Sequence, residues 1–335
     1  MFLARDGMNK NVRFLRSWAT TAIKLLTTAA LLCTAVAALM LGSTSFALAQ
    51  ENDRSPVYLS GSGNIALDQH IQSLLEKKLE SHRDLILISD VQAAFAEDAP
   101  IVTIGSGAFS RVRQANRNAP ILALLVEQDF IEGFARRSSG RISGIYHGVP
   151  LIRQALIGKA ILPQASRIAL IATTSTAELY ETLIDQLPEH NLEARLFVVD
   201  DDKQLIPTLI RALSYGDFLL AAPDNAIYNP RTIKHILLTA YRRNKIVIGP
   251  SQAYVKAGAL ASGYAPFPVM AEMAALYLQA FFETGMFPEP GYPAIFRVKI
   301  NQQVARSLNI PLAPPEQIIQ AVELRLMDQR GQGDE

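Results

Sequence analysis

The sequence has little cysteine and almost no net charge. Its only cysteine, Cys33, lies in an apolar run near the N-terminus, so a chain cleaved beyond that run has no thiol and no disulfide. The formal net charge is +1 over 335 residues, which does not indicate a nucleic-acid-binding protein. Residues 1–49 hold five basic residues against one acidic residue, a net of +4, so the remainder carries about −3. The positive charge therefore belongs to the N-terminal segment.

The sequence also lacks the signatures of common enzymes. It has no G-x-x-x-x-G-K-[ST] phosphate loop and no G-x-S-x-G nucleophile elbow. The three consecutive aspartates Asp200-Asp201-Asp202 could form a cation site. A turn that caps a helix starting near Lys203 explains them better. We therefore predict a protein without catalysis, cofactor or metal. A hydrolase that uses Asp224 with a nearby serine stays an alternative, although no base–nucleophile spacing supports it. The histidines are scattered without the spacing of metal ligands: His70, His82, His147, His190 and His235.

The first 49 residues have the pattern of a secretory signal. A basic region ends at Lys24, an apolar run covers 25–42, and the small-residue site Ala47-Leu48-Ala49 precedes Gln50. The length of the apolar run also fits an uncleaved membrane anchor. Because the A-x-A spacing is good, we favour cleavage after Ala49 and predict a periplasmic protein.

Short apolar runs alternate with helix-length segments in the rest of the chain, of which hydrophobic residues make up 49% overall. Such an alternation is typical of parallel sheets covered by helices on both faces. The runs form two series with a break near 140–165, so we predict an α/β protein with two similar lobes. The predicted strands are 57–60, 85–88, 101–105 and 121–125, and then 167–172, 194–199, 217–221 and 245–249.

Beyond Ser262 the pattern changes to a helix at 269–282 and a late strand at 294–300. Since the second series already has enough strands for its sheet, we expect both elements to return to the first lobe. A chain that crosses between lobes more than once has a hinge, and the cleft beside it is a natural ligand site. The predicted division is 50–145 plus 266–300 for lobe one, 146–265 for lobe two, and 301–335 as a C-terminal helical segment.

Polar residues stand where several predicted strands end, and ligands bind at the carboxyl ends of parallel strands. Each of these residues could instead be a helix N-cap, and Ser175 with Glu178 has the capping-box spacing. Pro230 is predicted to start a helix capped by Asn229, so the pair at 224–225 stands a turn too early for capping, which favours a ligand role. The two tyrosines near the crossovers could instead serve packing. The candidate ligand residues are Ser60, Ser106, Tyr146, Thr174, Ser175, Glu178, Asp224, Asn225 and Tyr264.

The segment from 217 to 262 resembles the substrate-binding proteins of ABC transporters, in the group with tryptophan-binding and other amino-acid-binding members. The shared features are a strand ending in Asp224-Asn225, a helix near 230–243, the strand "KIVIGPS", and the segment "VKAGALA" at 255–261. The later "VKINQQVARSLNIPL" is similar to the family's closing strand and helix. The resemblance covers roughly 85–315 and implies a type I periplasmic binding protein fold. In that fold two Rossmann-like lobes, joined by a hinge of three crossovers, close on a small ligand.

The resemblance also implies a function and site residues. The pair Asp224-Asn225 matches the family's D-N pair, and 173–178 matches its polar loop. The family's G-[V/I]-x-D element reads Gly144-Ile145-Tyr146-His147 here, without the acid, which leaves open whether the ligand is an amino acid. The implied partners are a small-molecule ligand and an inner-membrane ABC permease, with no nucleic acid and with membrane contact only through the leader or the permease. A ligand-sensing or accessory periplasmic protein of the same fold is the alternative.

Overall fold

The computed structural model describes residues 56–330 except 80–82, 97 and 223. The predicted secretory signal, its cleavage site after Ala49 and Cys33 lie outside the described residues. Within those ranges, no helix is long and apolar enough to cross a membrane.

The first sheet has five parallel strands in the order β2-β1-β3-β4-β5. Its central strands are continuous apolar runs, and every residue of β3 is buried, because helices cover both faces of the sheet. The strands are β1 (Val57–Ser60), β2 (Leu85–Leu87), β3 (Ile101–Ile104), β4 (Ile121–Val126) and β5 (Ile142–Tyr146). The strand β5 was not among the strands predicted from the sequence, since its "ISGIY" lay in the expected break.

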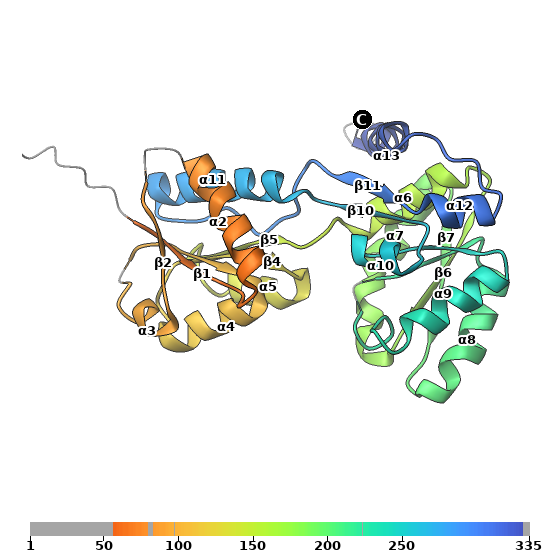
Figure 1. Ribbon diagram of the computed structural model, residues 1–335, viewed down its shortest axis with the longest axis horizontal. Helices are drawn as coiled ribbons and strands as arrows, with labels where there is room; N and C mark the ends of the chain where they lie inside the picture. The colour runs from red at the N-terminus through yellow and green to blue at the C-terminus, as the bar shows by residue number, and fades with distance from the viewer. Residues whose placement is uncertain (1–55, 80–82, 97, 223, 331–335) are drawn as a thin grey trace, which may run out of the picture. The chain divides into compact units, whose positions relative to one another are not determined.

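Among the described residues, five helices pack on this sheet and form the first lobe with it. They are α2 (Ile65–Leu79), α3 (Asp90–Ala93), α4 (Gly105–Ala115), α5 (Gln128–Ala135) and α11 (Phe267–Thr284). Figure 1 shows α2 and α11 side by side, and their buried side chains, such as Leu75 and Leu278, belong to one core with β1, β3 and β4. Phe109 of α4 and Ile131 of α5 belong to the core on the other face. The helix predicted at 269–282 therefore does return to the first lobe.

The second sheet has six strands in the order β11-β10-β9-β8-β6-β7, and only the β10–β11 pair is antiparallel. The strands are β6 (Arg167–Ala172), β7 (Glu193–Val198), β8 (Phe218–Leu220), β9 (Ile246–Ile248), β10 (Ala261–Tyr264) and β11 (Arg297–Ile300). We expected the late strand to join the first lobe, and this prediction was wrong. The reason is β10, an unpredicted strand whose outer edge β11 covers, with Ala261 opposite Ile300 and Tyr264 opposite Arg297.

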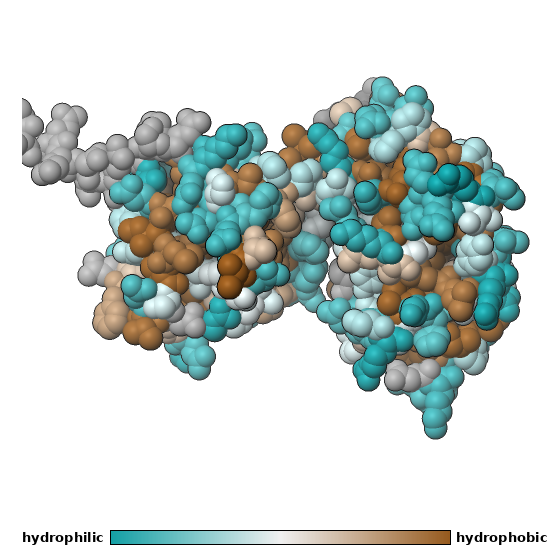
Figure 2. Space-filling view, in the orientation of Figure 1, coloured by the Kyte–Doolittle hydropathy of each residue, from teal (hydrophilic) through white to brown (hydrophobic). Residues whose placement is uncertain are grey.

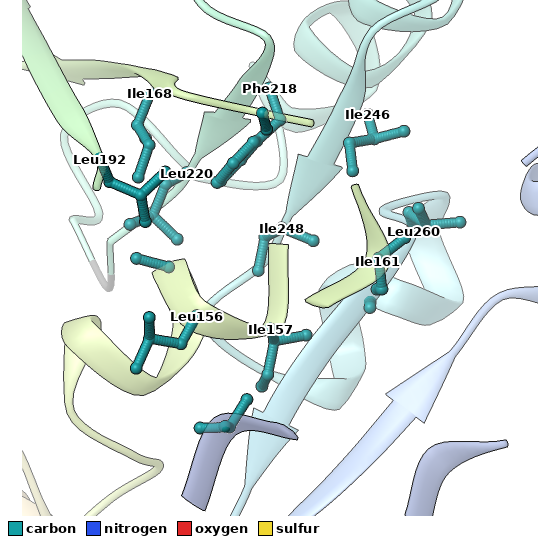
Figure 3. Close-up of a cluster of buried hydrophobic side chains, with 14 of the residues drawn as sticks. Leu156, Ile157, Ile161, Ile168, Leu192, Phe218, Leu220, Ile246, Ile248 and Leu260 are labelled. Carbon is teal, nitrogen blue, oxygen red and sulfur yellow. The ribbon is translucent and has the colours of Figure 1, made fainter. Parts of the chain in front are cut away.

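Helices cover both faces of the second sheet. They are α6 (Leu151–Ile161), η2 (Thr174–Tyr180), α7 (Glu181–Gln186), η3 (Leu187–His190), α8 (Asp202–Tyr215), α9 (Ile233–Arg242), α10 (Gln252–Ala257), α12 (Gln302–Ser307) and α13 (Pro315–Arg330). Figure 3 shows Leu156 and Ile157 of α6 in one cluster of buried side chains with Phe218, Ile246 and Ile248 of the sheet. Gly158 permits this approach, because a Cβ there would lie 2.6 Å from the Phe218 ring.

Three segments of chain pass from one sheet to the other: after β5, after β10 and after α11. The last of them first runs beside β5. The Tyr146 backbone N–H donates to the Gly291 carbonyl (3.0 Å), and the Gly291 N–H donates to the Gly144 carbonyl (3.0 Å). The chain thereby covers the outer edge of the first sheet before it reaches the second.

Apolar side chains are exposed at the other edge of the first sheet. Val91 and Phe95 are 74% and 79% exposed, and Leu87 of β2 is 56% exposed. Figure 2 shows hydrophobic surface over this part of the first lobe, which holds β2 and α3 in Figure 1.

Candidate functional site

In the first lobe, the candidate site begins where β1 and β3 end. Ser60 lies opposite Thr103 in the register of the two strands, and both side chains are buried. The Thr103 hydroxyl has no hydrogen-bond partner among the described residues. Asp68 holds the loop after Ser60, since its carboxylate accepts from the Ser62 N–H (2.8 Å), the Ser62 hydroxyl (2.7 Å) and the Gly63 N–H (3.0 Å). This edge of the sheet is therefore ordered and polar.

The helix α4 starts directly at the end of β3, without a connecting loop. Its N-cap is Ile104, which has no side chain that could accept from the first-turn N–H groups. Gly105 has φ +82°, a conformation that favours glycine and makes the abrupt turn possible. Ser106 is exposed in the first turn. The first-turn amides of α4 are thus uncapped at the surface, where backbone N–H groups and the helix dipole favour an anion.

Arg111 connects this helix start to the loop after β1. Its Nη2 donates to the Gly61 carbonyl at 2.9 Å. The structure therefore brings the candidates Ser60 and Ser106 to one ordered end of the first sheet. Ser60 is buried and Ser106 is exposed, so of the two only Ser106 offers its side chain to a solute in solution.

In the second lobe, the loop after β6 forms the 3-10 helix η2. A capping box joins Thr173 and Thr176: the Thr173 N–H donates to the Thr176 Oγ1 (3.0 Å), and the two hydroxyl oxygens lie 2.9 Å apart. We expected the box between Ser175 and Glu178, and this expectation was wrong, because the helix starts one residue after Thr173. Ser175 and Glu178 are exposed instead.

Thr174 is occupied by a neighbouring carboxylate. Its N–H and its hydroxyl donate to the two Asp200 oxygens at 2.8 and 2.6 Å, and these bonds lower the pKa of Asp200. Asp201 caps α8 by accepting from the Lys203 N–H (2.9 Å), which confirms the capping interpretation of the aspartate run. Among the residues that the structure describes, no cluster of His, Cys, Asp and Glu could hold a metal ion.

Asp224 is buried (2% exposed) and organises the loop after β8. Its Oδ1 accepts from the N–H groups of Ala226 (2.8 Å) and Ile227 (3.4 Å), and its Oδ2 accepts from the Thr176 hydroxyl (2.6 Å). Asp224 stands too early in the chain to cap α9, as we expected, but the sequence did not indicate that it caps its own turn. Its carboxylate also connects the two polar loops of the second lobe, while Asn225 beside it is exposed.

The helix after this loop starts later than the sequence predicted. The N-cap of α9 is Thr232, whereas Pro230 lies in the preceding turn. The Asn229 side chain accepts from the N–H groups of Arg231 (3.0 Å) and Thr232 (3.3 Å), so it caps this turn rather than the helix. The chain from 224 to 232 is therefore a continuous series of turns at the surface of the lobe.

Tyr180 and Tyr254, which the sequence analysis did not single out, support these turns through hydrogen bonds, and Tyr228 is buried within the turns themselves. The Tyr180 hydroxyl donates to the Ile171 carbonyl (3.2 Å) and accepts from the Ala222 N–H (3.2 Å). The Tyr254 hydroxyl donates to the Tyr228 carbonyl. Burial raises the pKa of Tyr180, Tyr228 and Tyr254, and the Asp224 carboxylate raises all three further.

The two predicted crossover tyrosines have different surroundings. Tyr146 is buried, and its hydroxyl donates to Glu132 (3.2 Å). Its ring packs edge-on against Tyr292 with 4.7 Å between centroids, and burial raises the pKa of Tyr292 to about 12. Tyr264, by contrast, lines a cavity of about 410 Å³ together with His147, Pro250, Ser251 and Phe267. The structure thus places Tyr264, but not Tyr146, at an accessible hollow.

A comparison of the sequence with protein-family models finds no match, and a comparison with curated proteins finds none at a significant level. Solved structures do match. A ligand-free, open substrate-binding protein with adhesive properties from Clostridium difficile is 14% identical, with a TM-score of 0.63; the match covers 78% of this chain and 97% of that chain. The ABC domain from Streptococcus pneumonia in complex with L-Trp is 15% identical, with a TM-score of 0.54, covering 80% and 98%.

A conserved domain protein from Vibrio cholerae O1 biovar El Tor str. N16961 is also similar. It is 17% identical, with a TM-score of 0.53, and the match covers 80% of this chain and 98% of that chain. At these identities the likeness concerns the fold. The two α/β lobes, their mostly parallel sheets and the three connecting segments confirm the architecture predicted from the sequence.

Proposed function

We propose that this chain, which has the type I periplasmic binding protein fold, is the periplasmic solute-binding component of an ABC-type uptake system. It captures a small polar molecule without chemical change and presents it to an inner-membrane permease. Secretion through the N-terminal signal belongs to the same proposal.

The observation that carries the proposal is the uncapped start of α4. Exposed first-turn amides without an N-cap side chain form a ready site for a carboxylate or another anionic head group. Ser106 adds a hydroxyl at the same place. The structures of similar fold include a substrate-binding protein and an ABC domain in complex with L-Trp, which supports a solute-binding role.

The second lobe supplies the other contacts in this proposal. Ser175, Glu178 and Asn225 are exposed on the two loops that the Thr176–Asp224 hydrogen bond joins. Asp224 and Thr174 act as positioning residues there, because their polar atoms already have partners. Tyr264 adds an aromatic wall beside the second crossover.

Closure follows from differential binding. A solute held by both lobes makes its full set of contacts only in a closed form, so binding shifts the population toward that form. The permease would then recognise the closed shape.

A ligand-sensing or accessory protein of the same fold is the second candidate, because binding and closure would be identical. Neighbouring genes separate the two: a permease and an ATPase favour transport, and a signalling receptor favours sensing.

A thermal-shift screen of the purified protein with amino acids, purines, sugars and small carboxylates tests the proposal. A compound at about a hundred times its dissociation constant adds about 2.7 kcal/mol of stability. We expect at least one compound with a negatively charged group to raise the unfolding temperature.

The variant Ser106→Asp tests the carrying observation. A carboxylate at this position occupies the α4 amides itself, so we expect unchanged or higher stability and at least about tenfold weaker binding of the selected compound. Ser110→Asp, one turn later in the same helix, adds the same charge and should leave binding unchanged. Calorimetric titration that found equal affinity for Ser106→Asp and the original protein would exclude α4 as the anion site.

A further inference from the structure

A second hollow lies at the opposite end of the first sheet. It has a volume of about 470 Å³ and is lined by residues that precede β4 and β5 and by the last turns of α4 and α5. The candidate solute site lies at the carboxyl ends of the strands, and this hollow lies at their amino ends. The two sites therefore use separate residues.

Four arginines line the hollow: Arg113, Arg117, Arg137 and Arg141. Asp98 is the one carboxylate among its described lining residues, and its side chain is 92% exposed, which weakens its neutralising effect. Arg113, Arg117 and Arg137 make no ion pair with any described residue. Burial lowers the pKa of Arg113, and the neighbouring charge of Arg117 lowers it further.

The walls of the hollow are ordered by hydrogen bonds. Asn116 accepts from the N–H groups of Asn118 and Ala119 (both 3.0 Å) and shapes the first loop. The Ser138 hydroxyl accepts from the Ile142 N–H (3.0 Å) in the second loop. Arg141 then joins the loops to each other.

Arg141 donates from Nε and Nη2 to the Asn118 carbonyl (3.1 and 2.8 Å) and from Nη2 to Asp98 (2.9 Å). Its guanidinium is therefore a structural cross-link. Arg113, Arg117 and Arg137 are left with guanidinium groups that no such contact uses. Phe134, over which Arg137 lies at 5.7 Å, gives the hollow an aromatic wall.

Basic residues often neutralise the carbonyl ends of helices, and α4 and α5 both end here. That role accounts for Arg113 in the last turn of α4. It does not account for Arg117 and Arg137, which follow the C-caps Asn116 and Arg136, or for the convergence on one cavity of three arginines that make no ion pair with a described residue. Guanidinium groups bind phosphate and carboxylate through paired hydrogen bonds, and several together select for multiple negative charges.

We propose that this arginine-lined hollow is a second binding site, for a small polyanion that carries two or more neighbouring phosphate or carboxylate groups. The volume suits a small molecule rather than a protein segment. Arg113, Arg117 and Arg137 bind the anion, and Arg141 positions the two loops.

Calorimetric titration of the purified protein at constant ionic strength tests the proposal, with pyrophosphate and citrate as probes and acetate as the singly charged control. We expect pyrophosphate, citrate or both to bind with a dissociation constant below about 1 mM and acetate not to bind. The pyrophosphate and citrate arms distinguish a phosphate ligand from a polycarboxylate.

The variants Arg113→Gln and Arg137→Gln should each weaken binding about tenfold, because each removes charge-assisted hydrogen bonds. Arg136→Gln is the matched control, since Arg136 is exposed next to Arg137 but does not line the hollow. Arg113→Gln should also keep or raise the unfolding temperature, because it removes repulsion from Arg117. This second measurement separates lost binding from a failure to fold.

Three results would overturn the proposal. The first is no binding of either polyanion, and the second is an equal loss in Arg136→Gln, which would indicate a diffuse basic surface. The third is tighter binding of hexaglutamate than of both small anions, which would indicate a protein partner. Ser106→Asp should not change polyanion binding, so this site and the solute site can fail independently.

Discussion

Thr176 shows how much a single hydroxyl does in the second lobe. It accepts from the Thr173 N–H within the capping box and donates to the buried Asp224 carboxylate. Thr174, two positions earlier, also donates to an aspartate, but that aspartate, Asp200, is exposed. Two threonines of η2 thus each donate to an aspartate, and only one of these aspartates, Asp224, is buried.

This difference predicts unequal costs for the two Thr→Val variants. Thr176→Val leaves a buried carboxylate with one hydrogen bond fewer, and we expect a loss of about 1.5–3 kcal/mol in the free energy of unfolding. Thr174→Val should cost much less than Thr176→Val, because water replaces the lost donor at Asp200. Chemical denaturation measures both. Equal losses would contradict the role assigned to Asp224 burial.

The sequence predicted which polar residues stand at strand ends, but not which of them are free to bind. Asp224 and Asn225 are neighbours in the same motif, yet the first is buried in hydrogen bonds and the second is exposed. Capping by Asp224 depends on the turn conformation after β8 and on the approach of η2. Neither is encoded in the spacing of the polar residues.

At the scale of elements, α6 is joined to β10 by one buried side chain. Gln154 donates from Nε2 to the Gly263 carbonyl (3.0 Å) and accepts at Oε1 from the Gly263 N–H (2.8 Å). A Cβ at Gly263 would lie 2.9 Å from Ile157 and from Val149, so the glycine also sets how closely α6 approaches. Since β10 leads directly into the second crossover, this contact holds the start of that crossover against α6.

Gln154→Ala should therefore lower the free energy of unfolding more than the substitution of an exposed glutamine does. It leaves the buried N–H of Gly263 without its acceptor, while the Gly263 carbonyl keeps the Ser262 hydroxyl as a donor (2.9 Å), and we expect a loss of about 1–3 kcal/mol in the free energy of unfolding. Gln114→Ala is the matched control, because Gln114 is exposed on α4, and it should change stability by less than about 0.5 kcal/mol. Similar midpoints in urea for both variants would refute this account of the contact.

Most strands were predictable because burial on both faces leaves a continuous apolar run, as in "RIALIA" of β6. The strands that the sequence did not predict are not continuous apolar runs. The strands β5, "ISGIY", and β10, "ASGY", contain glycine and serine and become strands through their neighbours. Partner strands and covering helices supply the stabilisation that their own sequences do not indicate.

At the scale of the whole molecule, the chain connects its two sheets three times, and the proposed function requires these connections to bend. Each lobe has its own hydrophobic cores, so a change at the connections need not disturb either interior. Lobes of this kind are expected to move as rigid bodies.

Spin labels on cysteines substituted for Gln114 in the first lobe and Lys203 in the second lobe test this movement. A compound that the thermal-shift screen selects should shift their distance distribution to shorter values, because closure brings both lobes onto the solute. Labels at Ser73 and Gln114, both in the first lobe, are the control and should keep their distribution. Binding without any shift between the lobes would contradict closure.

The sequence by itself determined the α/β class, the two series of parallel strands and the end of each sheet at which polar residues gather, because continuous burial and strand direction are local properties of the pattern. Only the tertiary structure decided that β11 completes the second sheet, that Asp224 caps its own turn, and that arginines from α4 and from the segments after α4 and α5 line one hollow. These features depend on edge pairing, on side-chain burial and on residues brought together from distant parts of the chain.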